Sequence, residues 1–194
     1  PQLPNVEQLR EIKLETPLQI YSRDKKLISE FGEKHSRPLR YNEVPPLLVH
    51  AFLAAEDDNF FNHQGVSLKG LARAFVGLAE SGSIQSGGST ITMQVAKNYF
   101  LSSQRTFSRK LTEILLAQNI EDALSKEEIL ELYVNKIYLG QRAYGIGAAA
   151  EVYYSKNVNQ LSLAEIAMIA GLPKAPSKYN PVVNPKRALE RRDW

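Results

Sequence analysis

The sequence contains no cysteine among its 194 residues. This absence excludes disulfides, thiolate nucleophiles and cysteine-ligated zinc or iron–sulfur sites, so redox chemistry does not indicate the compartment. Histidine is scarce too, and His35, His50 and His63 do not have the spacing of metal ligands. The sequence therefore gives no reason to expect a dedicated metal site.

Long apolar runs are also absent. No segment is apolar over the roughly 20 residues needed to span a bilayer. The chain begins at Pro1 rather than Met and stops at Trp194, inside the charged, helix-like segment PKRALERRDW. We expect a domain cut from a longer protein, so the lack of an anchor in this sequence does not show that the longer protein has none.

The composition is that of a packed globular protein, with 43% hydrophobic and 23% charged residues. The net charge of +3 is modest but uneven. Four basic residues and one acid lie between Lys97 and Glu113, whereas five acids and one lysine lie between Glu121 and Glu131. The first block could hold an anionic group, and the second predicts a solvated face.

The N-terminal part differs from the rest of the chain. Two β-prone runs, at 18–21 and 27–31, flank a polar turn and predict a hairpin. Residues 1–45 are therefore interpreted as an extended and hairpin segment, packed on a domain of residues 46–194.

Helical signals dominate after residue 45. The boxes Ser125-x-x-Glu128 and Ser162-x-x-Glu165 predict two helix starts, with ends at Gly140 and at Gly171. Between residues 103 and 124, apolar residues recur at helical spacing and predict a helix with an apolar stripe. Its members are Phe107, Leu111, Ile114 and Leu115.

Three consecutive acids, Glu56 to Asp58, end the apolar run in AFLAAEDDNFFNHQG, residues 51–65. A helix C-terminus disfavours each acid by roughly 0.3–1 kcal/mol. The preceding apolar turn, with Asp57 and Asp58 as like-charged neighbours, would raise the pKa of Glu56 toward that of a general acid or base. The alternative is a surface acid beyond a frayed helix end.

The segment GGSTITMQVAKN predicts a helix capped by Ser89 or Thr90, with free N–H groups that could bind phosphate. Thr90, Gln94 and Lys97 would share one face of this helix. An ordinary capped helix is the alternative. The preceding residues, 77–90, are rich in glycine and serine and predict either a lid or a disordered connector.

A basic cluster in RTFSRKLTE places Arg105, Arg109 and Lys110 near Glu113. Such pairs on an exposed helix are worth only about 0.3–0.5 kcal/mol and are usually surface features. Together with Lys97, however, they would offer cations for a pyrophosphate. Glu56 in apolar surroundings and Glu113 among cations indicate glycosyl chemistry on a sugar diphosphate.

Five motifs in one order resemble the peptidoglycan glycosyltransferases, the family-51 module of class A penicillin-binding proteins and monofunctional transglycosylases. The motifs are EDDNFFNHQG, GGSTITMQVAKN, RKLTEILLA, KEEILELYVNKIYLGQRAYGIGAAAEVYY and LSLAEIAMIAGLPKAPSKYNP. The resemblance implies a mainly α-helical, lysozyme-like fold with a large lobe and a smaller membrane-facing lobe. It also implies polymerisation of lipid II, with inversion at C1 of the donor sugar.

The resemblance assigns roles to individual residues. Glu56 matches the general base, and Glu113 matches a second carboxylate that acts around the donor's diphosphate. Lys110 and Arg105 match the cations that stabilise this leaving group, and Asp57 follows the base as in the family. The residues that match the substrate-lining helix are Ser89, Thr90, Gln94 and Lys97.

The resemblance also implies a membrane-anchoring N-terminal helix before the module. The partners that it implies are lipid II, the growing glycan chain, the outer face of the bacterial cytoplasmic membrane and the cell-wall synthesis machinery, but no nucleic acid. No cofactor is expected to be required, although Mg²⁺ or Mn²⁺ could help to neutralise a diphosphate. The apolar residues 74–79 are interpreted as dipping into the membrane surface. Two alternatives remain open: a lysozyme-like lytic enzyme, and a non-catalytic module that binds anionic lipid.

Overall fold

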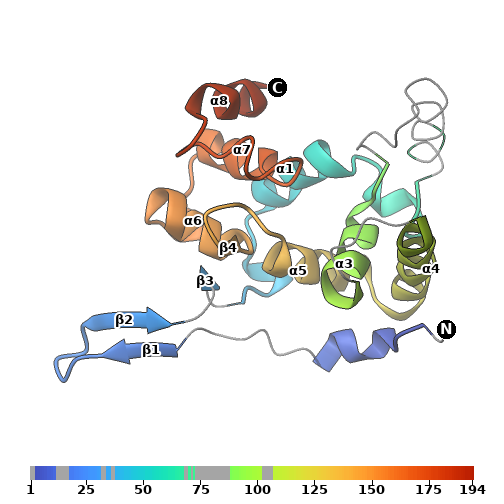
Figure 1. Ribbon diagram of the computed structural model, residues 1–194, viewed down its shortest axis with the longest axis horizontal. Helices are drawn as coiled ribbons and strands as arrows, with labels where there is room; N and C mark the ends of the chain where they lie inside the picture. Colours follow the sequence, from blue (N-terminus) through green and yellow to red (C-terminus); the bar gives the residue numbers. More distant parts are fainter. Residues whose placement is uncertain are drawn as a thin grey trace. The chain divides into compact units, whose positions relative to one another are not determined.

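The computed structural model describes residues 3–11, 18–31, 34–35, 38–67, 70, 72, 88–101 and 107–194. These residues are mostly helical, so the predicted mainly α class is confirmed (Figure 1). The chain forms two compact units, Pro1–Ile12 with Val49–Lys136 and Lys13–Leu48 with Ile137–Trp194. The predicted packing of residues 1–45 on a domain of residues 46–194 stays a prediction. Within the described part, no helix is both long and apolar enough to cross a bilayer.

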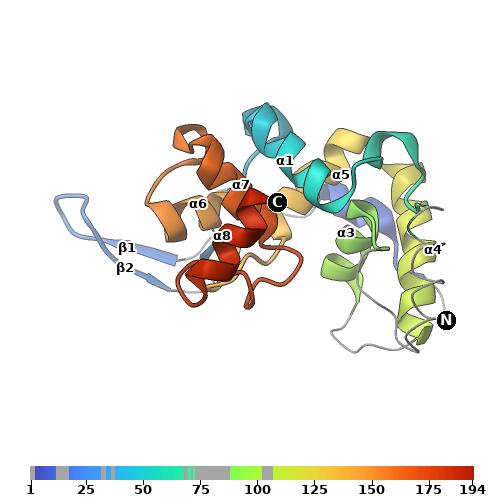
Figure 2. The same cartoon turned by 90° about the horizontal axis from the view of Figure 1, so that it is seen from above.

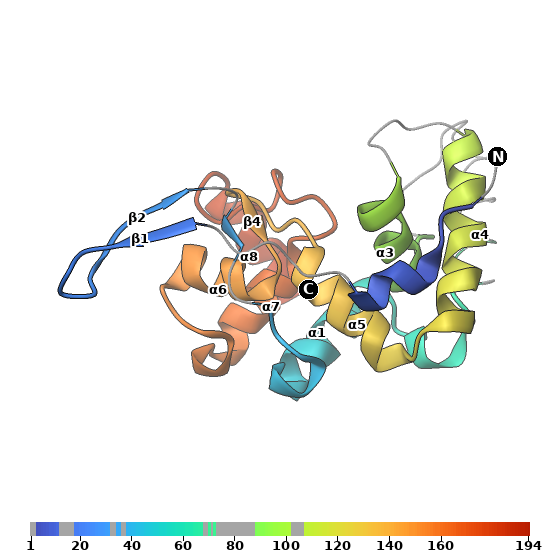
Figure 3. The same ribbon diagram turned by 90° about the horizontal axis from the view of Figure 1, so that it is seen from below.

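The first unit is built around α3. This helix packs against both α4 and α5, and the 3-10 helix η1 lies against α4 (Figure 3). The elements are η1 (Val6–Glu11), the end of α1 (Pro46–Glu56), η3 (Phe60–Asn62), α3 (Ile91–Phe100), α4 (Phe107–Ala123) and α5 (Lys126–Lys136). The fully buried core side chains include Phe52, Phe60, Ile91, Met93, Leu116, Ile120, Leu130 and Tyr133.

A polar anchor ties α3 to α4 and α5 on its side away from Glu56. The Thr92 hydroxyl donates to Glu121 at 2.6 Å. Lys126 pairs with Glu121 at 2.7 Å, donates to the His63 carbonyl at 2.7 Å and lies 4.4 Å from the ring centre of Phe60. The acidic block that contains Glu121 predicts a solvated face. Glu121 does not belong to such a face, because Lys126 and Thr92 compensate its burial.

Gly65 marks the closest approach between this unit's turn and α4. Its φ is +78°, and a Cβ there would lie 2.7 Å from the carbonyl oxygen of Ala117. Both the left-handed backbone and the lack of space require glycine. The turn after η3 can therefore press against α4 while its carbonyl faces Thr90.

The buried face of α4 differs from the predicted stripe. The predicted helix is present as α4, but Leu111 is 55% exposed and Leu115 is 43% exposed, so these two stripe residues do not belong to its buried face. The helix instead buries Glu113, Leu116, Ala117 and Ile120. The spacing of apolar residues cannot predict this buried face, because the face includes the carboxylate of Glu113, whose burial depends on two cations of the same helix.

The second unit carries the hairpin and the C-terminal helices. Strand β1 (Leu18–Tyr21) pairs antiparallel with β2 (Leu27–Phe31), with Leu18 opposite Phe31, which confirms the predicted hairpin. Strand β3 (Lys34–His35) pairs in parallel with β4 (Ala143–Tyr144). The remaining elements are η2 (Tyr41–Glu43), α6 (Ile146–Tyr154), η4 (Val158–Gln160), α7 (Leu163–Gly171) and α8 (Pro185–Asp193). Figure 2 shows α7 beside α8, which pack together.

Both predicted capping boxes are present, but one helix end differs. Ser125 and Glu128 bond reciprocally to each other's backbone N–H at 3.2 and 2.7 Å, and Ser162 and Glu165 form the same motif. Helix α7 ends at Gly171 as predicted, whereas α5 ends at Lys136 rather than at Gly140. Gly140, with φ of +83°, instead lies in a tight turn. Backbone hydrogen bonds from Leu139 to Ala143 and from Ala143 to Gly140 close this turn.

Candidate active site

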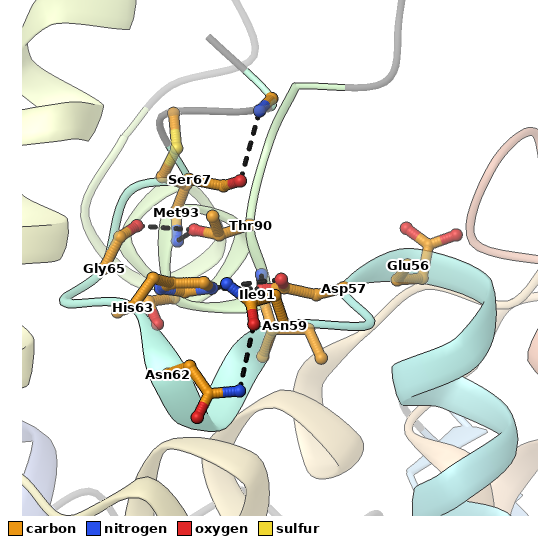
Figure 4. A network of polar contacts seen from close by, with 12 residues as sticks. Glu56, Asp57, Asn59, Asn62, His63, Gly65, Ser67, Thr90, Ile91 and Met93 are labelled. Atoms are coloured by element: carbon orange, nitrogen blue, oxygen red, sulfur yellow. Dashed lines mark hydrogen bonds and ion pairs between the residues drawn. The ribbon is translucent and has the colours of Figure 1, made fainter.

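Glu56 and Asp57 are adjacent in sequence but their side chains diverge. Helix α1 ends at Glu56, and the Asp57 N–H makes one more helical bond, to the Leu53 carbonyl at 2.9 Å. Figure 4 shows the Glu56 carboxylate turned away from Asp57, whose side chain faces His63. The end of the helix therefore delivers two acids to two different environments.

Asp57 lies in a closed polar network. The His63 Nε2 atom lies 3.0 and 2.9 Å from the two Asp57 oxygens, and the Ile91 N–H donates to Asp57 Oδ2 at 2.9 Å. The side chains of His63 and Asp57 are 6% and 5% exposed. Asp57 thus places negative charge at the N-terminus of α3, where the helix dipole favours it.

Thr90 caps the same helix. Its Oγ1 accepts from the Met93 N–H at 3.1 Å and donates to the Gly65 carbonyl at 2.6 Å (Figure 4). Of the two predicted caps, Thr90 is the one used. The prediction of free N–H groups at this helix end is wrong for Ile91 and Met93, because the protein itself satisfies both.

Gln94 connects α3 to Glu56. Its Nε2 donates to Glu56 Oε2 at 3.0 Å, and the residue is 8% exposed. Glu56 is half-buried rather than exposed to bulk solvent. Lys97 follows Gln94 by three residues on the same helix. Helix α3 therefore both binds the Glu56 carboxylate and carries the Lys97 ammonium.

The predicted second carboxylate, Glu113, organises a pair of cations. It is 2% exposed, pairs with Arg109 at 3.2 Å and is in direct contact with the Lys110 ammonium. Lys110 also donates to the Ser89 hydroxyl at 2.7 Å, on the segment just before α3. Glu113 and Ser89 therefore hold Lys110 between α4 and the start of α3.

Lys97 belongs to the same electrostatic neighbourhood. Burial lowers the pKa of Lys97 below its ordinary 10.5, while Glu113 opposes the change, Arg109 and Lys110 add to it, and Glu56 opposes it. A half-buried ammonium near two further cations binds an anion more strongly than an ammonium in water does. The cluster of Lys97, Arg109 and Lys110 is therefore suited to an anionic group.

Tyr133 lies below the acids. It is fully buried, packs edge-on against Phe52 with ring centres 5.8 Å apart, and its hydroxyl has no hydrogen-bond partner in the described part of the chain. Burial, followed by the charges of Glu56 and Asp57, raises the pKa of Tyr133 well above its ordinary value. The two acids therefore lie close enough to this buried ring to act on its hydroxyl.

The structure brings together most of the predicted site residues. Those that it describes within the first unit are Glu56, Asp57, Ser89, Thr90, Gln94, Lys97, Lys110 and Glu113. Arg105, most of the predicted lid and the apolar residues 74–79 lie outside the described residues. In the part that is described, no group of three His, Asp or Glu side chains could hold a metal ion.

His63 and Tyr133 were not predicted as parts of the site. The signal for His63 is its position six residues after Asp57 and two residues before Gly65. Tyr133 gave no such signal, because an aromatic residue at helical spacing predicts only a core position.

Comparisons with known proteins show the family of the chain. The profile of the Transglycosylase family matches residues 24–194. Penicillin-binding protein 1A of Pseudomonas aeruginosa is 66% identical over the whole chain, and that of Neisseria gonorrhoeae is 54% identical. The chain spans 24% of the length of each of these relatives.

A crystal structure of penicillin-binding protein 1A from Haemophilus influenzae is similar as well. It is 33% identical, with a TM-score of 0.49, over 94% of this chain and 18% of that one. The resemblance given by the five motifs is confirmed by the family match and the relatives. The chain belongs to the transglycosylase family and is a peptidoglycan glycosyltransferase domain.

Proposed function

We propose that the domain polymerises lipid II, an undecaprenyl-diphosphate-linked disaccharide-pentapeptide, into glycan strands. The 4-hydroxyl oxygen of the acceptor sugar attacks C1 of the donor, and Glu56 takes the hydroxyl proton as general base. The bond from C1 to the diphosphate oxygen breaks, the electron pair leaves with undecaprenyl diphosphate, and the configuration at C1 inverts.

One observation carries the proposal: Gln94 holds Glu56 on the helix that also bears Lys97. A base and a cation served by one rigid element can act on the two ends of one reaction, the attacking hydroxyl and the departing diphosphate. Fixed donors and charges of this kind stabilise a transition state without reorganising during the reaction.

Under this proposal the cations divide the leaving-group charge. Lys97 and Lys110 contact the diphosphate, and Arg105 joins them from outside the described residues. Glu113 positions Lys110 and Arg109 rather than transferring a proton, since its two oxygens are held by these cations. Gln94 orients the base.

Ser89, Thr90 and Asp57 act at the edge of the site. Ser89 orients Lys110 through its hydroxyl and lines the substrate path. Thr90 and Asp57 serve the substrate by holding the first turn of α3, where their polar atoms are engaged. The loop before Gly88 remains a predicted lid over the growing chain.

The substrate also implies a place and partners. A lipid-linked donor is presented at the outer face of the bacterial cytoplasmic membrane, and the product joins the growing glycan chain, next to the cell-wall synthesis machinery. We propose that no cofactor is required and that Mg²⁺ or Mn²⁺ adds to the neutralisation of the diphosphate. Chelation with EDTA, which would lower the rate without abolishing it, tests this point.

Incubation of the chain with radiolabelled lipid II in detergent tests the function. We expect glycan polymer on a gel and equimolar release of undecaprenyl diphosphate. Binding without turnover would instead support an anionic-lipid module, and shortening of added glycan strands would support a lytic enzyme. Either of these results would overturn the proposal.

A further inference from the structure

His63 and Asp57 form a buried pair between the end of α1 and the start of α3 (Figure 4). Both Asp57 oxygens face His63 Nε2, and one of them also accepts from the Ile91 N–H. A carboxylate in this position only accepts, so Nε2 must carry the proton of the imidazole. His63 is therefore a donor at Nε2.

The other ring nitrogen makes no polar contact. In the described part of the chain, the buried Nδ1 atom has no hydrogen-bond partner. The ring is therefore held through Nε2, by its contact with Asp57.

Asp57, which His63 holds, belongs to a closed series of contacts that includes Glu56. Asp57 holds the Ile91 N–H, the first turn of α3 leads from Ile91 to Gln94, and Gln94 donates to Glu56. Glu56 is joined to Asp57 by the peptide bond. Every link is either covalent, helical or a hydrogen bond of 3.0 Å or less. The rotamer of Asp57 therefore bears on the placement of Glu56.

We propose that His63 is a positioning residue for glycosyl transfer, a role that rests on the proposed function. By locking Asp57 onto the Ile91 N–H, it fixes the first turn of α3 and, through Gln94, the carboxylate of Glu56. His63 itself does not touch the substrate. Its contribution is to the geometry of the base.

A double-mutant cycle on lipid II turnover tests this role. His63→Ala is expected to lower kcat roughly 10- to 100-fold, as small misplacements of a catalytic group do, with KM changed less than about threefold. His63→Gln, whose amide can donate from the position of Nε2, is expected to restore most of kcat. In a Gln94→Ala background, His63→Ala is expected to cost much less, since the link to Glu56 is already broken.

Thr92→Val is the matched control. It removes a buried hydrogen bond from the same helix, on the side tied to Glu121. It is expected to lower stability about as much as His63→Ala while leaving kcat unchanged. Additive effects of His63→Ala and Gln94→Ala, or an equal kcat loss in Thr92→Val, would reduce His63 to a structural residue and overturn the inference.

Amide hydrogen exchange separates this inference from the proposed function. Exchange is measured in His63→Ala and in His63→Gln. The Ile91 amide is expected to exchange at least about tenfold faster in His63→Ala than in His63→Gln, with the amides of α5 unchanged. If the wild type makes no polymer, the proposed function fails, but this exchange result still decides whether the pair holds α3. Wild-type protection at Ile91 in His63→Ala would overturn the inference in either case.

Discussion

The two acids at the end of α1 occupy contrasting regions. Around Asp57 the protein is closed: a buried histidine and a helix N–H hold its oxygens. Around Glu56 it is less closed, because the carboxylate is half-buried, accepts from Gln94 and is coupled electrostatically to Lys97. One acid stabilises the fold, and the other remains available for chemistry.

The contrast shows that direction, rather than sequence proximity, decides what a carboxylate does. The helix ends at Glu56, so the next residue leaves the helical path and its side chain enters the interior. Mutation of Glu56 is therefore expected to act mainly on activity, and mutation of Asp57 mainly on stability. The reverse result at these two positions would contradict this interpretation.

Glu56→Gln should cause the largest loss. It keeps the shape and a hydrogen-bonding group but removes the base, so turnover of lipid II is expected to fall about 10²- to 10⁴-fold. Substrate binding and the melting temperature should stay near wild type. Glu127→Gln, at an exposed position on α5, is the control that should keep full activity. A fully active Glu56→Gln would remove this residue from the mechanism.

Lys110→Ala should come next. Loss of a fixed charge at the leaving group is expected to raise the barrier by about 2–4 kcal/mol, or roughly 30- to 1,000-fold in kcat. Single-turnover release of undecaprenyl diphosphate measures it. The exposed Lys186→Ala serves as control. Wild-type release rates in Lys110→Ala would contradict the assignment of this cation to the diphosphate.

Asp57→Ala tests the structural role of this acid through the stability of the protein. It leaves the Ile91 N–H and the His63 donor without their acceptor, and is expected to lower the free energy of unfolding by about 2–4 kcal/mol. Urea denaturation gives this value. Asp58→Ala, at the exposed neighbouring acid, should change it by less than about 0.5 kcal/mol. Equal effects at the two positions would mean that Asp57 is not a structural acid.

Lys97→Met should have the smallest effect on stability, with the opposite sign. Because burial lowers the pKa of Lys97 below 10.5, the unfolded chain binds this proton more tightly than the folded chain. Wild-type stability should therefore rise with pH in the window just below 10.5, and Lys97→Met should be slightly more stable at pH 7 and lack this rise.

Turnover by Lys97→Met should fall at least about tenfold, because a cation at the diphosphate is lost. Melting temperatures between pH 7 and 10, with the exposed Lys174→Met as control, measure the linkage. A destabilised Lys97→Met, or one with unchanged turnover, would show that this ammonium serves the fold instead of the substrate.

The sequence predicted the local elements and the family better than the side-chain geometry. Caps at Thr90, Ser125 and Ser162 and the hairpin were predictable because their signals lie within a few residues. The buried face of α4 was not, since Glu113 is buried only by virtue of its ion pairs. The Asp57–His63–Ile91 network was also out of reach, because it joins segments that only the fold brings together.

The most direct test of the central claim is the pH dependence of kcat/KM in the wild type and in Glu56→Gln. If Glu56 removes the acceptor proton, the wild-type rate falls as the pH is lowered and the base is protonated. The residual activity of Glu56→Gln should lack this acid limb. An acid limb of the same position and slope in both proteins would show that another group takes the proton.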